Sequence, residues 1–220
     1  MFNDFEKFAM SQGIGTNKLN SFQKLNNRVI EPYVLEEREL NCQPMSVFSR
    51  LMYDRIIFLG TAIDDDVANI INAQLLYLNS TGSEDISLFI NSPGGSVIDG
   101  LSIYDIMNFV KPDVATYCVG MCASMAGVLL SSGAKGKRYS LPNGEIMLHQ
   151  LSGGSYGMYA DMKIAVEHAS RLHEKLIKIL AENTNKDTET IRKDIDRDNW
   201  FDAENALNYS LIDKIIKTAK

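Results

Sequence analysis

The sequence lacks the features that mark nucleic-acid-binding, metal-binding and secreted proteins. Its 22 Lys+Arg are outnumbered by 28 Asp+Glu, and the formal net charge of −6 argues against nucleic acid or an anionic membrane as the main partner. The three cysteines, Cys42, Cys118 and Cys122, are an odd number without zinc-like spacing or a neighbouring histidine. We therefore expect no metal site, and buried thiols in a reducing cytoplasm.

Two further absences concern membranes and targeting. Residues 1–27 are polar and have no apolar core of the kind found in a secretory signal. The uncharged run Val114–Ala134 is long enough to span a bilayer, but serine, glycine, threonine and cysteine dilute its few strongly apolar residues. We read this run as a buried strand followed by a buried helix and predict no transmembrane segment.

What is present is a regular alternation of short apolar strands and longer amphipathic helices. Residues 1–27 differ from the rest and are interpreted as a tail or a processed propeptide. Strands are predicted at 55–59, 86–90, 114–119, 138–141 and 145–149, and helices at 47–52, 64–78, 98–109, 123–132, 158–182, 188–196 and 203–208. Such strand–helix–strand units predict an α/β fold with a mainly parallel sheet.

Two glycine-rich turns follow predicted strands and open predicted helices. They are Asn91–Gly95 and Gly120–Ser124. Turns of this kind present backbone N–H groups to a phosphate or to a transition-state oxyanion. Neither turn matches a dinucleotide fingerprint or a P-loop. The alternative is that they are merely tight connections.

Ser124 begins an apolar helix, where its hydroxyl could act either as a helix cap or as a nucleophile. A nucleophilic serine needs a base, and among the three histidines His149 ends a predicted strand, whereas His168 and His173 fall inside a long helix. The many aspartates leave the third partner open. Residue spacing therefore predicts only a possible serine hydrolase of unassigned fold, since the Gly-x-Ser-x-Gly motif is absent.

A set of ordered motifs resembles the ClpP family of serine peptidases, the proteolytic subunits of Clp proteases. The motifs are Phe89–Gly95, Ser102–Asp105, Lys111–Val114, Gly120–Met125, Gly133–Arg138, Leu141–Asn143, Met147–Gln150, Asp196–Asp198, Ala203–Ala206 and Leu211–Asp213. The resemblance implies that Ser124 is the nucleophile, His149 the general base and Asp198 the residue that orients His149. It also assigns the oxyanion hole to the backbone N–H groups of Gly95 and Met125.

The same resemblance implies a crotonase-like core of repeated βαβ units over 46–220, with a protruding strand–helix handle at about 150–183. Residues 28–45 would form an axial N-terminal loop, although Leu40–Ser46 departs from the family pattern. Gly153 and Gly154 would contact the peptide substrate, and Phe89 and Phe109 would line a pocket for a partner. The resemblance implies no cofactor for this subunit.

The implied assembly is a heptameric ring, doubled to a tetradecamer, with a hexameric AAA+ unfoldase that uses ATP and delivers unfolded or tagged proteins. Two other functions stay open at this point. One is a non-catalytic ring subunit of the same assembly, and the other is a crotonase-like acyl-CoA enzyme. Neither would need Ser124, His149 and Asp198 together.

Overall fold

The computed structural model describes residues 33–36 and 43–218, so the predicted propeptide and most of the predicted axial loop lie outside the described residues. The chain divides into two units, residues 1–50 and 51–220. In the first unit, β1 (Tyr33–Glu36) pairs antiparallel with β2 (Gln43–Ser46), and α3 (Val47–Tyr53) follows across the boundary between the units.

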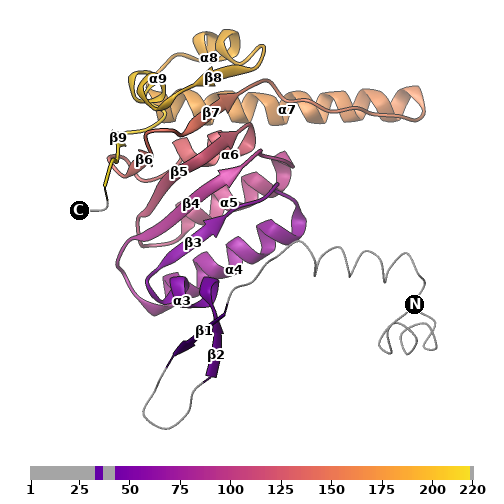
Figure 1. Ribbon diagram of the computed structural model, residues 1–220. Helices are drawn as coiled ribbons and strands as arrows, with labels where there is room; N and C mark the ends of the chain where they lie inside the picture. Colours follow the sequence, from indigo (N-terminus) through magenta and orange to yellow (C-terminus); the bar gives the residue numbers. More distant parts are fainter. Residues whose placement is uncertain (1–32, 37–42, 219–220) are drawn as a thin grey trace, which may run out of the picture. The chain divides into compact units, whose positions relative to one another are not determined.

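The second unit is built on a mainly parallel sheet (Figure 1). Its strands are β3 (Ile56–Leu59), β4 (Ile86–Ser92), β5 (Val114–Ala123), β6 (Arg138–Ser140), β7 (Glu145–Leu148), β8 (Asn199–Phe201) and β9 (Lys214–Ile215). They run in the order β3-β4-β5-β6-β9, and β7 pairs with the last part of β5. β8 is antiparallel to β7. The predicted α/β fold with a mainly parallel sheet is confirmed.

The helices of this unit are α4 (Asp65–Thr81), α5 (Val97–Phe109), α6 (Met125–Ser131), α7 (Tyr159–Thr184), α8 (Thr188–Asp194) and α9 (Ala203–Tyr209). Several begin at a side-chain cap, because Asp64, Ser96, Asp187 and Asp202 each accept a hydrogen bond from the backbone N–H three residues later. In the part of the chain that the structure describes, no helix has the length and hydrophobicity needed to cross a bilayer.

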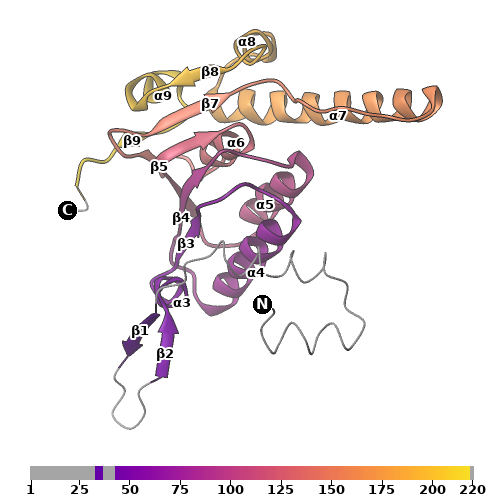
Figure 2. The same cartoon turned by 45° about the vertical axis from the view of Figure 1, so that its right-hand side comes forward.

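The two faces of the sheet differ. Helices α4 and α5 lie side by side on one face, as Figures 1 and 2 show, and the apolar residues between these helices and the sheet form part of the core, which continues through α6 and the last turns of α7. The other face of β3 to β6 carries an aromatic row in register. Its members are Phe58, Phe89, Tyr117 and Tyr139, and the Phe89 and Tyr117 rings stack with centroids 4.4 Å apart.

Helix α7 projects beyond the sheet in both views (Figure 2). Its last turns carry Leu176, Ile177 and Leu180 into the core, whereas residues 152–161 are all exposed. The resemblance implied a strand before this helix, but residues 149–158 contain none. A strand requires a hydrogen-bonded partner, and no described residue of this chain pairs with the segment.

Candidate active site

The first part of the site is the turn between β5 and α6, which places Ser124. The register of β4 against β5 shifts between Ile90 and Ser92, so β5 bulges there. Gly120 has φ +81° inside the bulge, and the Met121 N–H donates to Asn91 Oδ1 at 3.2 Å. Because of the bulge, β5 continues beyond its predicted end at residue 119, and Ser124 follows it at the carboxyl end of the sheet.

Ser124 itself is strained, with φ 55° and ψ −124°, a region that residues other than glycine rarely adopt. Such a residue costs about 1–3 kcal/mol and persists only when its surroundings hold it. Here the Ser124 N–H donates to the Met147 carbonyl at 2.8 Å, and its own carbonyl accepts from the N–H groups of Gly127 and Val128. The side chain makes no helix-capping hydrogen bond, so the helix-cap interpretation is wrong.

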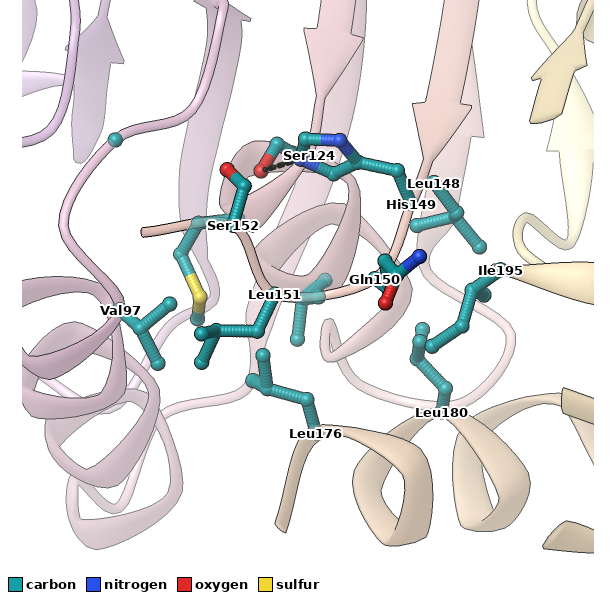
Figure 3. Close-up of a pocket in the computed structure, with 13 residues that line it drawn as sticks. Val97, Ser124, Leu148, His149, Gln150, Leu151, Ser152, Leu176, Leu180 and Ile195 are labelled. Atoms are coloured by element: carbon teal, nitrogen blue, oxygen red, sulfur yellow. Dashed lines mark hydrogen bonds between the residues drawn. The ribbon is translucent and has the colours of Figure 1, made fainter. Parts of the chain in front are cut away.

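The Ser124 hydroxyl instead pairs with His149. Its Oγ lies 2.8 Å from His149 Nε2 (Figure 3, dashed line). The parallel pairing of β5 with β7 explains the contact, because Ala123 and Met147 are register partners and both strands end just before the site. The carboxyl ends of neighbouring parallel strands thus bring together two residues that are distant in sequence.

Asp198 reaches the other nitrogen of the same ring. It lies in the loop between α8 and β8, and its Oδ1 is 3.3 Å from His149 Nδ1. The antiparallel pairing of β7 with β8 brings the loop there, since Leu148 pairs with Asn199. The Asp198 side chain is 63% exposed and that of His149 is 25% exposed, so the carboxylate is at the rim of the site.

The two glycine-rich turns also meet. A Cβ atom placed on Gly94 would lie 2.5 Å from the Ala123 carbonyl oxygen and 2.9 Å from the Met125 nitrogen, so the turns are in direct contact. Gly95 forms a parallel bridge with Ile63. In this bridge the Ile63 N–H donates to the Gly94 carbonyl and the Ser96 N–H donates to the Ile63 carbonyl, so the Gly95 N–H takes no part. The Gly95 N–H is therefore directed away from Ile63. The Met125 N–H belongs to the first turn of α6, where the N–H groups have no acceptor within the helix.

A pocket opens beside Ser124, lined by aliphatic side chains together with the polar residues His149, Gln150 and Ser152 (Figure 3). Its lining includes Val97, Met125, Val128, Leu148, Leu151, Leu176, Leu180 and Ile195. The sequence predicts the apolar stripe of α7 but not that this stripe lines the site. Gly153 and Gly154, the predicted peptide contacts, are exposed and are not among the lining residues, whereas their neighbours Leu151 and Ser152 are.

The remaining predicted residues lie elsewhere. Phe89 belongs to the aromatic row, and Phe109 is the last residue of α5 with 72% of its surface exposed. Cys118 and Cys122 are buried free thiols in β5. A hydrogen bond from Cys122 lowers the pKa of Cys118, whereas burial raises the pKa of Cys122. The described residues contain no cluster of ligating side chains arranged for a metal ion.

A model of the Clp protease family matches residues 38–219. The chain belongs to the Clp protease family. It is 48% identical over 217 residues to the "ATP-dependent Clp protease proteolytic subunit" of Porphyromonas gingivalis, and the match covers 98% of each chain. Proteins with the same description from Bacteroides fragilis and Bacteroides thetaiotaomicron are 48% and 47% identical, over 97% of this chain and 98% of theirs.

Membership of the Clp protease family makes this chain a peptide-bond hydrolase of the proteolytic-subunit type. The resemblance found in the sequence is thereby confirmed, and the acyl-CoA enzyme is set aside. Of the residues that the resemblance singled out, Ser124, His149 and Asp198 are in contact, and Gly95 and Met125 line the same pocket as Ser124.

Proposed function

We propose that Ser124, His149 and Asp198 are the catalytic triad of a serine endopeptidase that cuts unfolded or tagged proteins into short peptides. The observation that carries the proposal is the continuous chain of contacts from Oγ through both ring nitrogens to a carboxylate, at 2.8 Å and 3.3 Å. A nucleophile that touches its base, with the base touching an orienting group, is the arrangement that acyl transfer to serine requires.

In the proposed reaction, His149 Nε2 takes the Oγ proton as Ser124 attacks the scissile carbonyl carbon. The resulting oxyanion is stabilised by the N–H groups of Gly95 and Met125, an interaction of the kind whose loss lowers the rate about 10²–10³-fold. The protonated His149 then gives its proton to the leaving amine. A water molecule, deprotonated by His149, then attacks the acyl carbon, and His149 returns the proton to Ser124 Oγ as the ester bond breaks.

The pocket supports a preference for an apolar side chain next to the scissile bond. Leu176, Leu180 and Ile195 line it, and filling such a site removes apolar surface from water. Gly153 and Gly154 stay in the proposal as backbone contacts to the peptide. They follow the pocket residues Leu151 and Ser152 directly along the chain.

The proposed assembly is a heptameric ring, doubled to a tetradecamer, in which the crotonase-like cores of residues 46–220 join through handles at about 150–183. The projecting part of α7 and its exposed apolar residues, among them Ile164 and Val166, support a contact between subunits there. Residues 1–27 would be a tail or propeptide and 28–45 the axial loop.

We further propose a hexameric AAA+ unfoldase as the partner that uses ATP, acting in the cytoplasm. The relatives are described as ATP-dependent, and the present sequence has neither nucleotide-binding fingerprint. Phe89 and Phe109 are the proposed docking positions, and the exposure of Phe109 supports this. The peptidase subunit itself would use no cofactor.

The test is fluorophosphonate labelling of the purified wild-type protein and Ser124→Ala, with the labelled peptide mapped and the assembly sized. We expect wild-type rings to be labelled at Ser124 and to cleave short peptides without ATP. Ser124→Ala should assemble but neither label nor cleave. Wild-type rings that never label would instead favour the non-catalytic ring subunit, and cleavage by Ser124→Ala would refute the nucleophile.

A further inference from the structure

The carboxylate of Asp198 is the most weakly fixed part of the proposed triad. Its distance of 3.3 Å from His149 Nδ1 is just beyond the usual range of about 2.7–3.2 Å for such a hydrogen bond, and the side chain is mostly exposed. Among the described residues, no other hydrogen bond or ion pair holds this carboxylate. Its position therefore depends on the loop that carries it.

That loop, Ile195–Asp198, is secured at its two ends. Ile195 is buried and its N–H bonds to the Ile191 carbonyl of α8, while Asn199 begins β8 and pairs with Leu148. The middle of the loop contains an ion pair at 3.7 Å between its own residues Asp196 and Arg197. The Asp196 N–H also donates to the Lys193 carbonyl of α8 at 3.3 Å, and Asn199 directly follows Asp198, so these anchors hold the backbone on both sides of Asp198 but not its carboxylate.

Gln150 supplies a second link between the loop and the histidine segment, beside the pairing of Leu148 with Asn199. It directly follows His149, and its Nε2 donates to the Asp196 carbonyl at 2.7 Å. Figure 3 shows its amide nitrogen turned away from Ser124, on the side of the pocket where Ile195 lies. One backbone segment thus carries both the proposed base and the clamp on the loop of its carboxylate partner.

We propose that Gln150 is a positioning residue that holds the loop so that Asp198 stays within reach of His149. The proposal rests on the triad proposed above. Because the Asp198 contact is already long, a shift of the loop by a fraction of an ångström breaks it. A Gln150 variant without the side-chain N–H donor should therefore lose part of the rate enhancement that Asp198 provides. When Asp198 is also replaced, the same variant should cause no further loss of rate.

The experiment is a double-mutant cycle on assembled rings with Gln150→Met, which keeps the length of the side chain but has no N–H donor. The readouts are kcat on a short peptide and the rate of fluorophosphonate labelling of Ser124, in the wild-type and Asp198→Ala backgrounds. Gln150→Met should lower both rates about 10–100-fold in the wild type, less than the roughly 10⁴-fold effect of disabling a triad aspartate. In the Asp198→Ala background it should lower them no further.

Gln74→Met is the matched control, because it removes the same amide from α4, which does not line the pocket. A second readout uses Trp200, the single tryptophan of the chain, which is 52% exposed and lies in β8 just after Asp198. Quenching of its fluorescence by acrylamide should increase in Gln150→Met and stay at the wild-type level in Gln74→Met.

Wild-type rates in Gln150→Met would overturn the proposal, and so would an equal loss in both backgrounds, since the residue would then act independently of Asp198. Failure of Gln150→Met to form rings, with Gln150→Glu failing likewise, would also overturn it, because Gln150 would then support the fold. By contrast, wild-type rings that do not label at Ser124 would refute the triad itself.

Discussion

Replacing Gly94 by alanine tests how closely the two glycine-rich turns must approach. Gly94 has φ +86°, and a Cβ atom there would lie 2.5 Å from the Ala123 carbonyl oxygen, 2.8 Å from Ser124 Cβ and 2.9 Å from the Met125 nitrogen. All three atoms belong to or adjoin the backbone of the nucleophile turn, so no rotamer change relieves the overlap. The turns have to move apart.

The size of that movement sets the expected loss of activity. Ordinary contact for a Cβ begins at 3.4 Å, so the closest pair must separate by the difference between 3.4 and 2.5 Å, or about 0.9 Å. Misplacement of reacting groups by about 1 Å lowers rates about 10²-fold. At about 1.36 kcal/mol per tenfold, this corresponds to about 2.7 kcal/mol of activation free energy. The loss should fall on kcat more than on KM.

Gly136→Ala provides the control. Gly136 has nearly the same backbone angle, φ +82°, but a Cβ atom there would meet nothing within 4 Å. Both variants should lose about 1–2 kcal/mol of stability from forcing alanine into this conformation. Only Gly94→Ala should also lose kcat, measured on a fluorogenic peptide with ring assembly and thermal unfolding checked in parallel. Equal kcat values for the two variants would refute the reasoning.

Three other predictions follow from the strained serine, the ion pair of a buried arginine and the thiols. Ser124→Gly should unfold at a higher temperature than Ser124→Ala, by about 1–3 kcal/mol in stability, because glycine accepts φ 55° without strain. Burial would raise the pKa of Asp213, but its hydrogen bonds from Arg138, whose side chain is 3% exposed, lower it overall. The stability from this pair is therefore present above the unfolded pKa of about 4 and lost as pH falls through the lower folded value. Accordingly, Asp213→Asn should cost about 3 kcal/mol at pH 7 and progressively less in acid, as measured by urea unfolding. In native protein at pH 8, Cys118 and Cys122 should resist a thiol reagent that modifies both after unfolding, because both are buried.

Much of the fold could be predicted because hydrophobic periodicity marks each long element. Helices such as α4 and α7 and the start of every long strand agree with the pattern of apolar residues. The pattern missed the short strands β1, β2, β8 and β9, because strands of two to four residues exist only through pairing, β1 with β2, β8 with β7 and β9 with β6. It also ended β5 too early, since the bulge at Gly120 interrupts the alternation.

The residues of the candidate site that directly follow strands of the sheet could be predicted from the sequence, whereas those placed by loop packing could not. Ser124 and His149 follow the ends of two paired strands, and both could be singled out from the turn and strand patterns. The choice of Asp198 among many aspartates came from the family resemblance alone, because its place depends on how a loop packs. The pocket likewise depends on packing, since the stripe of α7 that carries Leu176 does not reveal which segment it faces.

The parts of the site consequently differ in stiffness. The Ser124 turn is held by three backbone hydrogen bonds and stands before α6, every residue of which is buried, so its strain of about 1–3 kcal/mol is stably maintained. His149 follows β7, which is paired on both sides. Asp198, in contrast, lies on an exposed loop whose middle is tied to the sheet through Gln150. A displacement of α8 or β8 therefore changes the His149–Asp198 distance before it changes the Ser124–His149 distance. The carboxylate contact is the element of the site most sensitive to its surroundings.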